Sequence, residues 1–389
     1  MSLRTLLRRY RNPLATSDGR IRYYNWWNKQ PADEIWFSSY LLKRGFLERY
    51  PKARFVLFSS LGSINLLRMD ALMRLAQAPS HPTKRIYFNG ENNHHPNFAP
   101  YLHNLLDHRS IDLSLGFDYT DDPRYMRFPL WILEMFPPAS SEKDIRRICD
   151  QLSHQHLEAS RNRFCALVSG NRGPDDPGAI LRNNMVQQLN AIATVDCAGK
   201  LLHNTDELKT KYNDNKAEFL KQYRFYICPE NASVEGYVTE KLFHCIGSGC
   251  IPIYWGAGGN PEPDILNHDA ILFWNPDGDN SALLQQISDL QRNPQQYKDF
   301  FEQPRLKDDA WQVVSFESAG EGEAYAEDIK KFANGDKELE EEYYKTTGAS
   351  EDSYLAQYQR AAVANYVEAN KLDIEAYQDF GQDPVSVTD

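Results

Sequence analysis

The sequence predicts an α/β protein built from two consecutive parallel sheets. Short apolar runs alternate with helical stretches along most of the chain, which is typical of strand–helix–strand architecture. A polar, helical stretch at residues 142–160 interrupts this alternation, which then starts again. The chain has 389 residues, enough for two domains at roughly 150 residues each. We therefore expect one domain at 1–155, a second at 156–345 and a helical tail at 346–389.

Three strands are expected in the first domain, and each is a short apolar run. They lie at residues 54–60, 84–90 and 111–117. A turn at Gly62 and a helix over 64–77 follow the first strand.

The pattern restarts in the second domain with four expected strands, at residues 163–170, 225–228, 251–255 and 271–274. Helices are expected to begin near Pro177, Thr239 and Ser281. Gly247 is expected to stop the middle helix.

The tail differs from both domains because its apolar residues form a single helical stripe over residues 353–380. We expect this helix to pack on the body of the protein. Contact with a second copy of the chain or with a membrane is the alternative, although the stripe lacks the basic face that membrane binding favours.

Composition excludes several classes of protein. Lys and Arg number 43 against 54 Asp and Glu, a formal net charge of −11. Nucleic-acid binding needs a basic surface, so we expect no nucleic-acid partner. No apolar run approaches the roughly 18 residues of a membrane span, so we expect no transmembrane segment. Six cysteines without a CxxC pair indicate reduced thiols in the cytosol, with disulfides or a zinc site as the alternative.

Polar residues that follow strands of the second domain predict a nucleotide site. Arg182, Asn231, Glu240 and Lys241 all come after expected strands, and ligands of open α/β sheets bind at the carboxyl ends of strands. Arg182 lies in the second turn of a helix capped by Asp176, where a guanidinium can grip a diphosphate. An ordinary surface arginine is an equally good interpretation from spacing alone.

Thr239 is a good N-cap, which places Glu240 and Lys241 in the first helical turn. A lysine there opposes the helix dipole, so removing it is expected to leave the empty fold unharmed. Free N–H groups at a helix N-terminus bind phosphate, and Lys241 becomes useful once an anion is bound. A solvated lysine on an ordinary helix is the alternative.

Glu91 directly follows the second strand of the first domain. A carboxylate at a strand end can accept a proton from an acceptor hydroxyl, whereas a turn-capping glutamate is the alternative. His94 and His95 lack the i, i+4 spacing of helical metal ligands, so we do not expect a metal there. The Asp277-Gly-Asp279 run is similar to a metal-binding DxD motif, but its Pro/Gly surroundings favour a turn.

Taken together, the motifs resemble the α1,3/α1,4-fucosyltransferases of glycosyltransferase family 10, especially bacterial members. They occur in family order across residues 22–335. The resemblance rests on Asn25-Trp-Trp-Asn28, Leu61-Gly-Ser63, Asn89-Gly-Glu-Asn92, Pro96-Asn-Phe98, Gly116-Phe-Asp118, Arg124-Tyr-Met-Arg-Phe-Pro-Leu130, Leu181-Arg-Asn183, Pro229-Glu-Asn231, Gly236-Tyr-Val-Thr-Glu-Lys241 and Ile251-Pro-Ile-Tyr-Trp-Gly256.

The resemblance implies a GT-B fold, with two Rossmann-like domains that face a cleft and a C-terminal helical extension. It implies that Glu91 is the general base and that Glu240 contacts the donor or stabilises the transition state. It also implies a diphosphate clamp of Arg182 and Lys241. The implied donor contacts are Asn231, Tyr237 and Glu240. The loop before Arg182 is longer than is usual in the family, which leaves Arg172 as an alternative to Arg182.

The implied function is inverting transfer of L-fucose from GDP-β-L-fucose to an oligosaccharide or glycoconjugate. The accepting hydroxyl belongs to N-acetylglucosamine or glucose in a β-galactoside-containing glycan, with α1,3 linkage favoured over α1,4. No cofactor is expected to be required, and a divalent metal is expected at most to stimulate. Transfer of another nucleotide sugar and an inactive glycan-binding protein are the alternatives. An oligomer would form through the C-terminal helix.

Overall fold

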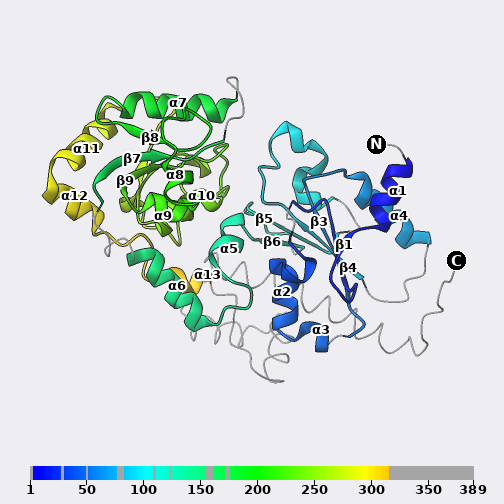
Figure 1. Ribbon diagram of the computed structural model, residues 1–389. Helices are drawn as coiled ribbons and strands as arrows, with labels where there is room; N and C mark the ends of the chain where they lie inside the picture. The colour runs from blue at the N-terminus through cyan, green and yellow to red at the C-terminus, as the bar shows by residue number, and fades with distance from the viewer. Residues whose placement is uncertain are drawn as a thin grey trace. The chain divides into compact units, whose positions relative to one another are not determined.

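The computed structural model describes most of the chain, namely residues 3–27, 30–49, 51–76, 83–107, 111–122, 124–154, 161–170 and 176–314. In this part the chain forms two compact units, each with its own sheet and surrounding helices (Figure 1). Unit 1 contains Met1–Phe128 and Pro137–Ser140, and unit 2 contains Pro129–Phe136 and Ser141–Ser315. The expected tail at 346–389, with its helix at 353–380, lies outside the described residues.

The sheet of unit 1 has its strands in chain order. They are β1 (Leu14–Ala15), β2 (Ile21–Tyr24), β3 (Arg54–Ser59), β4 (Thr83–Phe88), β5 (Leu113–Gly116) and β6 (Tyr125–Arg127). The pairing of β1 with β2 is antiparallel and every other pairing is parallel. The three expected strands are confirmed as β3, β4 and β5. Strands β1, β2 and β6 were not predicted, and they have only two to four residues each.

Helices of unit 1 pack around this sheet. They are α1 (Leu3–Arg11), α2 (Trp36–Lys43), α3 (Phe46–Arg49) and α4 (Asn65–Ala76), with 3-10 turns η1 (Ala32–Glu34) and η2 (Pro96–Leu105). A buried ion pair joins Arg85 of β4 to Asp70 of α4, and the Tyr10 hydroxyl of α1 donates to the same carboxylate at 3.1 Å. These contacts hold both helices against the sheet.

The sheet of unit 2 is parallel throughout, in the order β11-β10-β9-β7-β8. Its strands are β7 (Arg163–Leu167), β8 (Val195–Cys197), β9 (Tyr223–Ile227), β10 (Ile251–Tyr254) and β11 (Leu272–Phe273). From β7 the chain first passes to β8 on one side and then returns to β9 on the other. The strand order therefore reverses between β7 and β9, which is the topological switch point where α/β sheets bind ligands.

The helices of unit 2 are α5 (Leu130–Met135), α6 (Glu142–His154), α7 (Pro177–Leu189), α8 (Glu207–Thr210), α9 (Lys216–Leu220), α10 (Glu240–Gly247), α11 (Ser281–Arg292), α12 (Pro294–Phe301) and α13 (Ala310–Val314), with 3-10 turns η4 (Ala257–Gly259) and η5 (His268–Ala270). The start of α7 is as predicted, because the Asp176 side chain accepts from the Ala179 N–H and Pro177 is the first helical residue. Helix α10 ends at Gly247, also as predicted.

Helix α5 packs on α10, although it precedes residue 156, where the second domain was expected to start. The Trp131 ring stacks on Phe243 with centroids 4.1 Å apart and 12° between the ring planes. Its indole N–H donates to the Glu262 carboxylate at 2.8 Å. Burial of Trp131 thus fixes α5 to unit 2.

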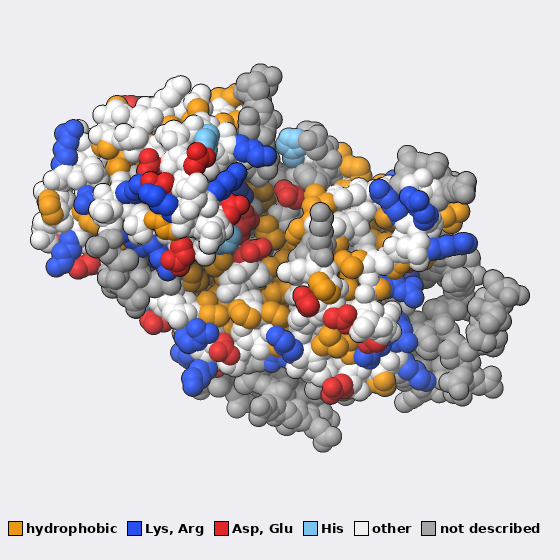
Figure 2. All heavy atoms as spheres, viewed as in Figure 1, with side chains coloured by type: hydrophobic (Ala, Val, Ile, Leu, Met, Phe, Trp, Pro, Cys, Tyr) orange, Lys and Arg blue, Asp and Glu red, His pale blue; other side chains and the backbone are white. Residues whose placement is uncertain are grey.

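All six cysteines are buried and free of disulfides, as the composition predicted. None of the helices in the described part of the chain has the length and apolar character needed to cross a membrane. On the face in Figure 2, acidic and basic side chains of the described residues are interspersed and do not form one basic patch.

Candidate active site

A cavity of about 250 Å³ opens at the carboxyl ends of β7 and β9, at the switch point of the unit 2 sheet. Its walls come from the residues that follow these two strands and from the N-terminal turns of α7, α9 and α10. Arg182, Asn231, Glu240 and Lys241 all line it. The structure therefore brings together four of the five predicted donor residues.

Arg182 joins α7 to the loop after β9 and is only 7 % exposed. Its Nη1 donates to the Gly178 carbonyl at 2.9 Å, and its Nη2 donates to the Pro229 carbonyl at 2.9 Å and to the Asn231 Oδ1 at 3.4 Å. These three hydrogen bonds fix the orientation of the guanidinium. Arg172, the alternative to Arg182, lies outside the described residues.

Lys241 is held by a buried carboxylate that the sequence analysis did not single out. Glu230 is fully buried and lies 3.2 Å from the Lys241 Nζ. The Thr239 N–H and hydroxyl donate to the two Glu230 oxygens at 2.8 and 2.7 Å, and Lys241 also donates to the Thr239 Oγ1 at 2.7 Å. Thr239 is the N-cap residue, as predicted, but its side chain does not cap the helix.

This arrangement overturns the prediction that the empty fold does not need Lys241. A lysine that only opposes the helix dipole is solvated, whereas here the ammonium is the counter-charge of a carboxylate with no access to water. Loss of a charge-assisted contact of this kind costs about 1.5–3 kcal/mol, more than the roughly 0.3–1 kcal/mol gained by relieving the dipole. Lys241 therefore stabilises the empty fold.

Because Gly256 has no side chain, the Glu230 side chain can pack against its backbone. The φ of Gly256 is 149°, and a Cβ there would lie 2.7 Å from the Glu230 Cγ and 2.7 Å from the Tyr254 hydroxyl. Three motifs, which contain Glu230, Lys241 and Gly256, thus meet at one wall of the cavity.

Glu240 presents a carboxylate at the cavity. Burial opposes its ionisation, but the Lys241 ammonium, its own backbone N–H, His244 and Lys216 outweigh this effect and lower the pKa of the Glu240 carboxyl. The group is therefore an anion at neutral pH, placed to contact a sugar hydroxyl or a developing positive charge.

Tyr237 is the fifth predicted donor residue, and the structure places it differently. Its side chain is 2 % exposed and does not line the cavity. A direct donor contact by Tyr237 stays a prediction.

Lys216 and Tyr226 also line the cavity, and the sequence analysis missed both. The Lys216 Nζ lies 5.1 Å from the centroid of the Tyr226 ring. Burial disfavours the ammonium, but Tyr226 and Glu240 outweigh it and raise the pKa of Lys216. Lys216 is the first residue of α9, which is capped by the Asn215 side chain. The sequence signal for this position is the capping Asn215, but α9 directly follows helix α8 and not a strand, so the rule that ligands bind at strand ends did not point to it.

Glu91 belongs to unit 1 and follows β4 at the carboxyl edge of its sheet. The Asn89 side chain bonds both the Glu91 N–H, at 3.2 Å, and the Glu91 carbonyl, at 2.5 Å. Glu91 is half-buried. Its position at a strand end is as predicted, and its role as a base stays a prediction.

The two metal interpretations considered above gain no support from the described residues, which contain no cluster of three or more His, Cys, Asp or Glu suited to a metal. Asp279 has a turn role, since its carboxylate accepts from the Ser281 N–H at 2.8 Å. The Asp277 N–H donates to the Asn275 side chain at 3.2 Å.

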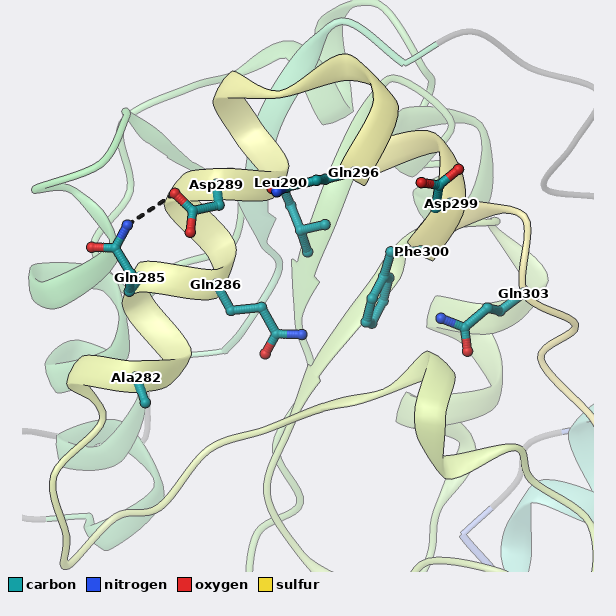
Figure 3. Close-up of a pocket in the computed structure, with 9 residues that line it drawn as sticks. All are labelled: Ala282, Gln285, Gln286, Asp289, Leu290, Gln296, Asp299, Phe300 and Gln303. Carbon is teal, nitrogen blue, oxygen red and sulfur yellow. Dashed lines mark hydrogen bonds between the residues drawn. The ribbon is translucent and has the colours of Figure 1, made fainter.

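A larger hollow of about 620 Å³ lies between α11 and α12. Figure 3 shows the amides of Gln286 and Gln303 on either side of the Phe300 ring. The residues that line it include four glutamines and two aspartates but no cation. It is therefore a poor site for a diphosphate, in contrast to the smaller cationic cavity.

Two α/β units with largely parallel sheets, one of them with a cationic cavity at its switch point, define a protein of the nucleotide-binding α/β class. The family model "Glycosyltransferase family 10 (fucosyltransferase) C-term" matches residues 158–319, and "Alpha-(1,3)-fucosyltransferase FucT N-terminal domain" matches residues 21–134. Together the two matches cover more than two thirds of the chain. The chain belongs to glycosyltransferase family 10.

Curated relatives match parts of the chain. Alpha-(1,3)-fucosyltransferase FucT of Helicobacter pylori is 34 % identical over 212 residues, 48 % of this chain and 41 % of the relative. GDP-fucose protein O-fucosyltransferase 3 of Xenopus tropicalis is 31 % identical over 160 residues, 39 % of this chain and 33 % of the relative. The matched part is thus less than half the length of these relatives.

A solved structure shares the fold. A crystal structure of an alpha1,3-fucosyltransferase is similar with a TM-score of 0.52 and 23 % identity, over 88 % of this chain and 94 % of that one. At this identity the likeness establishes the fold alone, and it confirms the predicted GT-B architecture.

Proposed function

We propose that this protein is an inverting fucosyltransferase that uses GDP-β-L-fucose. The acceptor is a hydroxyl of N-acetylglucosamine or glucose in a β-galactoside-containing glycan, with α1,3 linkage favoured over α1,4. One observation carries the proposal: Arg182, Lys216 and Lys241 converge with Glu240 on the switch-point cavity of a family 10 chain. Three cations suit a diphosphate, and a carboxylate beside them suits the sugar.

In the proposed reaction Glu91 accepts the proton of the acceptor hydroxyl. The acceptor oxygen then forms a bond to the anomeric carbon of fucose while the bond from that carbon to the β-phosphate oxygen breaks. GDP leaves with the electron pair of the broken bond, and the β-linked donor gives an α-linked product. Arg182, Lys216 and Lys241 stabilise the charge that grows on the diphosphate, so part of their effect belongs to the transition state.

The proposed function is tested by measuring GDP release and the anomeric configuration of the product. The purified protein is incubated with GDP-fucose, with and without N-acetyllactosamine, and GDP release is measured. Acceptor-dependent release with an α-fucosyl product supports the proposal. Release only with another nucleotide sugar favours the first alternative, and glycan binding without any release favours an inactive glycan-binding protein.

Removal of Lys216 is expected to weaken donor binding. Lys216→Met keeps the length of the side chain but loses one charge-assisted contact to the diphosphate, so we expect the Kd for GDP to rise about 10- to 100-fold. Titration calorimetry with GDP measures this. Lys221→Met is the matched control, because Lys221 pairs with exposed Glu218. Equal GDP affinity in the two variants would remove Lys216 from the donor site.

Chelation of metals is expected to leave most of the activity intact. In this proposal three side-chain cations stabilise the charge on the leaving GDP. A divalent ion is therefore expected at most to stimulate the transfer reaction. Initial rates in excess EDTA, with and without added Mn²⁺, measure this. Complete loss in EDTA that Mn²⁺ restores and Asp277→Asn abolishes would instead establish a metal-dependent reaction at the DxD run.

The compartment is part of the same proposal. Six buried thiols without a disulfide suit a reducing environment, so we place the protein in the cytoplasm, peripheral at the inner membrane at most.

A further inference from the structure

The loop that carries Glu91 is held at two points. At its start, the Ser60 hydroxyl donates to the Asn89 Oδ1 at 2.8 Å, and Asn89 in turn bonds the backbone of Glu91. Farther along, the buried Asn93 side chain donates to the Asn104 Oδ1 at 2.6 Å. These hydrogen bonds therefore hold the loop in one conformation on both sides of Glu91.

Asp118 connects this second point to a histidine. Its Oδ2 accepts from the Asn104 Nδ2 at 2.7 Å, and its Oδ1 lies 2.5 Å from the His94 Nε2. Its own N–H donates to the Tyr125 hydroxyl at 2.9 Å. The Asp118 side chain is only 16 % exposed, whereas that of His94 is 53 % exposed. One nearly buried carboxylate thus holds an imidazole that faces water.

This contact determines how His94 bonds a ligand. A carboxylate oxygen accepts, so the Nε2 of His94 carries the proton, and in the neutral ring Nδ1 is then a hydrogen-bond acceptor. Holding an exposed ring in one orientation has an entropic cost that an ordinary surface histidine avoids. Glu91 and His94 share one loop, and Asp118 follows β5, the parallel neighbour of β4. All three are therefore at the carboxyl edge of the unit 1 sheet, where α/β ligands bind.

We propose that His94, oriented by Asp118, binds the sugar acceptor beside Glu91. Its Nδ1 accepts a hydrogen bond from a hydroxyl other than the one Glu91 deprotonates, so the ligand is a neutral, polyhydroxylated glycan. Asp118 is a positioning residue that acts through His94. This inference rests on the proposed function, because it takes Glu91 to be the base.

The test uses the full chain and compares adjacent histidines. Initial rates are measured for His94→Phe, His94→Gln, His95→Phe and Asp118→Asn while GDP-fucose and N-acetyllactosamine are varied separately. His94→Phe is expected to raise the acceptor KM roughly three- to tenfold, the effect of one neutral hydrogen bond, without changing the donor KM. His94→Gln, whose amide oxygen can accept, should recover part of the loss. His95→Phe should resemble wild type, and Asp118→Asn should resemble His94→Phe.

Binding of N-acetyllactosamine, measured by ligand-observed NMR, separates this inference from the proposed function. If wild type transfers no fucose but binds the glycan, and His94→Phe binds it several-fold more weakly than His95→Phe, the proposed function fails and the glycan site stands. If His94→Phe matches His95→Phe in both acceptor KM and binding, the inference is wrong even in an active enzyme. If wild type neither transfers fucose nor binds the glycan, both are wrong.

Discussion

Replacement of Glu91 by Gln is expected to lower kcat about 10²- to 10⁴-fold and to leave the Kd for GDP nearly unchanged. The amide keeps the shape of the side chain but cannot accept the acceptor proton. The two hydrogen bonds between the Asn89 side chain and residue 91 involve only the backbone of residue 91, so they survive the change. In our proposal GDP binds to unit 2, whereas Glu91 lies in unit 1. The Kd for GDP should therefore stay nearly unchanged when kcat falls.

The measurement is a steady-state rate at saturating donor and acceptor, together with a GDP titration of each variant. Glu48→Gln is the control, since Glu48 is an exposed glutamate of the same unit. Near-normal turnover in Glu91→Gln would assign the residue to the turn and leave the reaction without its base.

Replacement of Glu230 by Gln is expected to destabilise unit 2 by about 1.5–3 kcal/mol, the cost of losing the charge-assisted contact to Lys241, whose ammonium stays partly exposed and 3.7 Å from Glu240. The amide can still accept from Thr239, but the Lys241 ammonium loses the carboxylate that lies 3.2 Å away. An amide N–H₂ group also has to be accommodated where two carboxylate oxygens now accept. Gly256, which has no room for a Cβ, leaves little space for Glu230 to move.

Urea unfolding measures this loss, on the transition that GDP shifts upward, because that transition reports the donor-binding unit. Glu218→Gln is the matched control, since the exposed pair of Glu218 with Lys221 is worth roughly 0–1 kcal/mol. Adding Lys241→Met to Glu230→Gln should cost less than Lys241→Met costs alone, because both changes remove the same ion pair. Equal unfolding midpoints for Glu230→Gln and Glu218→Gln would mean that this pair does not support the fold.

The sequence predicted the elements that local patterns encode strongly. Strands β3 and β10 contain continuous apolar runs, at residues 55–58 and 251–254, and the Asp176-Pro177 start of α7 is a local capping signal, so these elements could be located without tertiary information. The two-residue β1 and the three-residue β6 could not, because runs this short have no period to detect. Their pairing partners alone make them strands.

The residues of the site also divide into those that the sequence predicted and those that only the structure revealed. Arg182, Asn231, Glu240 and Lys241 could be grouped from sequence because each follows a parallel strand, and parallel strands end at one edge. Lys216 follows no strand and reaches the cavity only through the packing of α9. Tyr237 belongs to the same motif as Lys241, yet the fold buries its side chain away from the cavity.

By itself, the sequence determined the class of fold, the edge of the unit 2 sheet that carries the cavity and the position of Lys241 in a first helical turn. Only the tertiary structure decided what Lys241 does there. The sign of its effect on stability depends on Glu230, 11 positions earlier, and on whether that carboxylate is solvated. Burial of Glu230 behind Gly256 removes its water, and a carboxylate without water needs a counter-charge. Solvation is a property of the packed chain, so no local pattern could have predicted it.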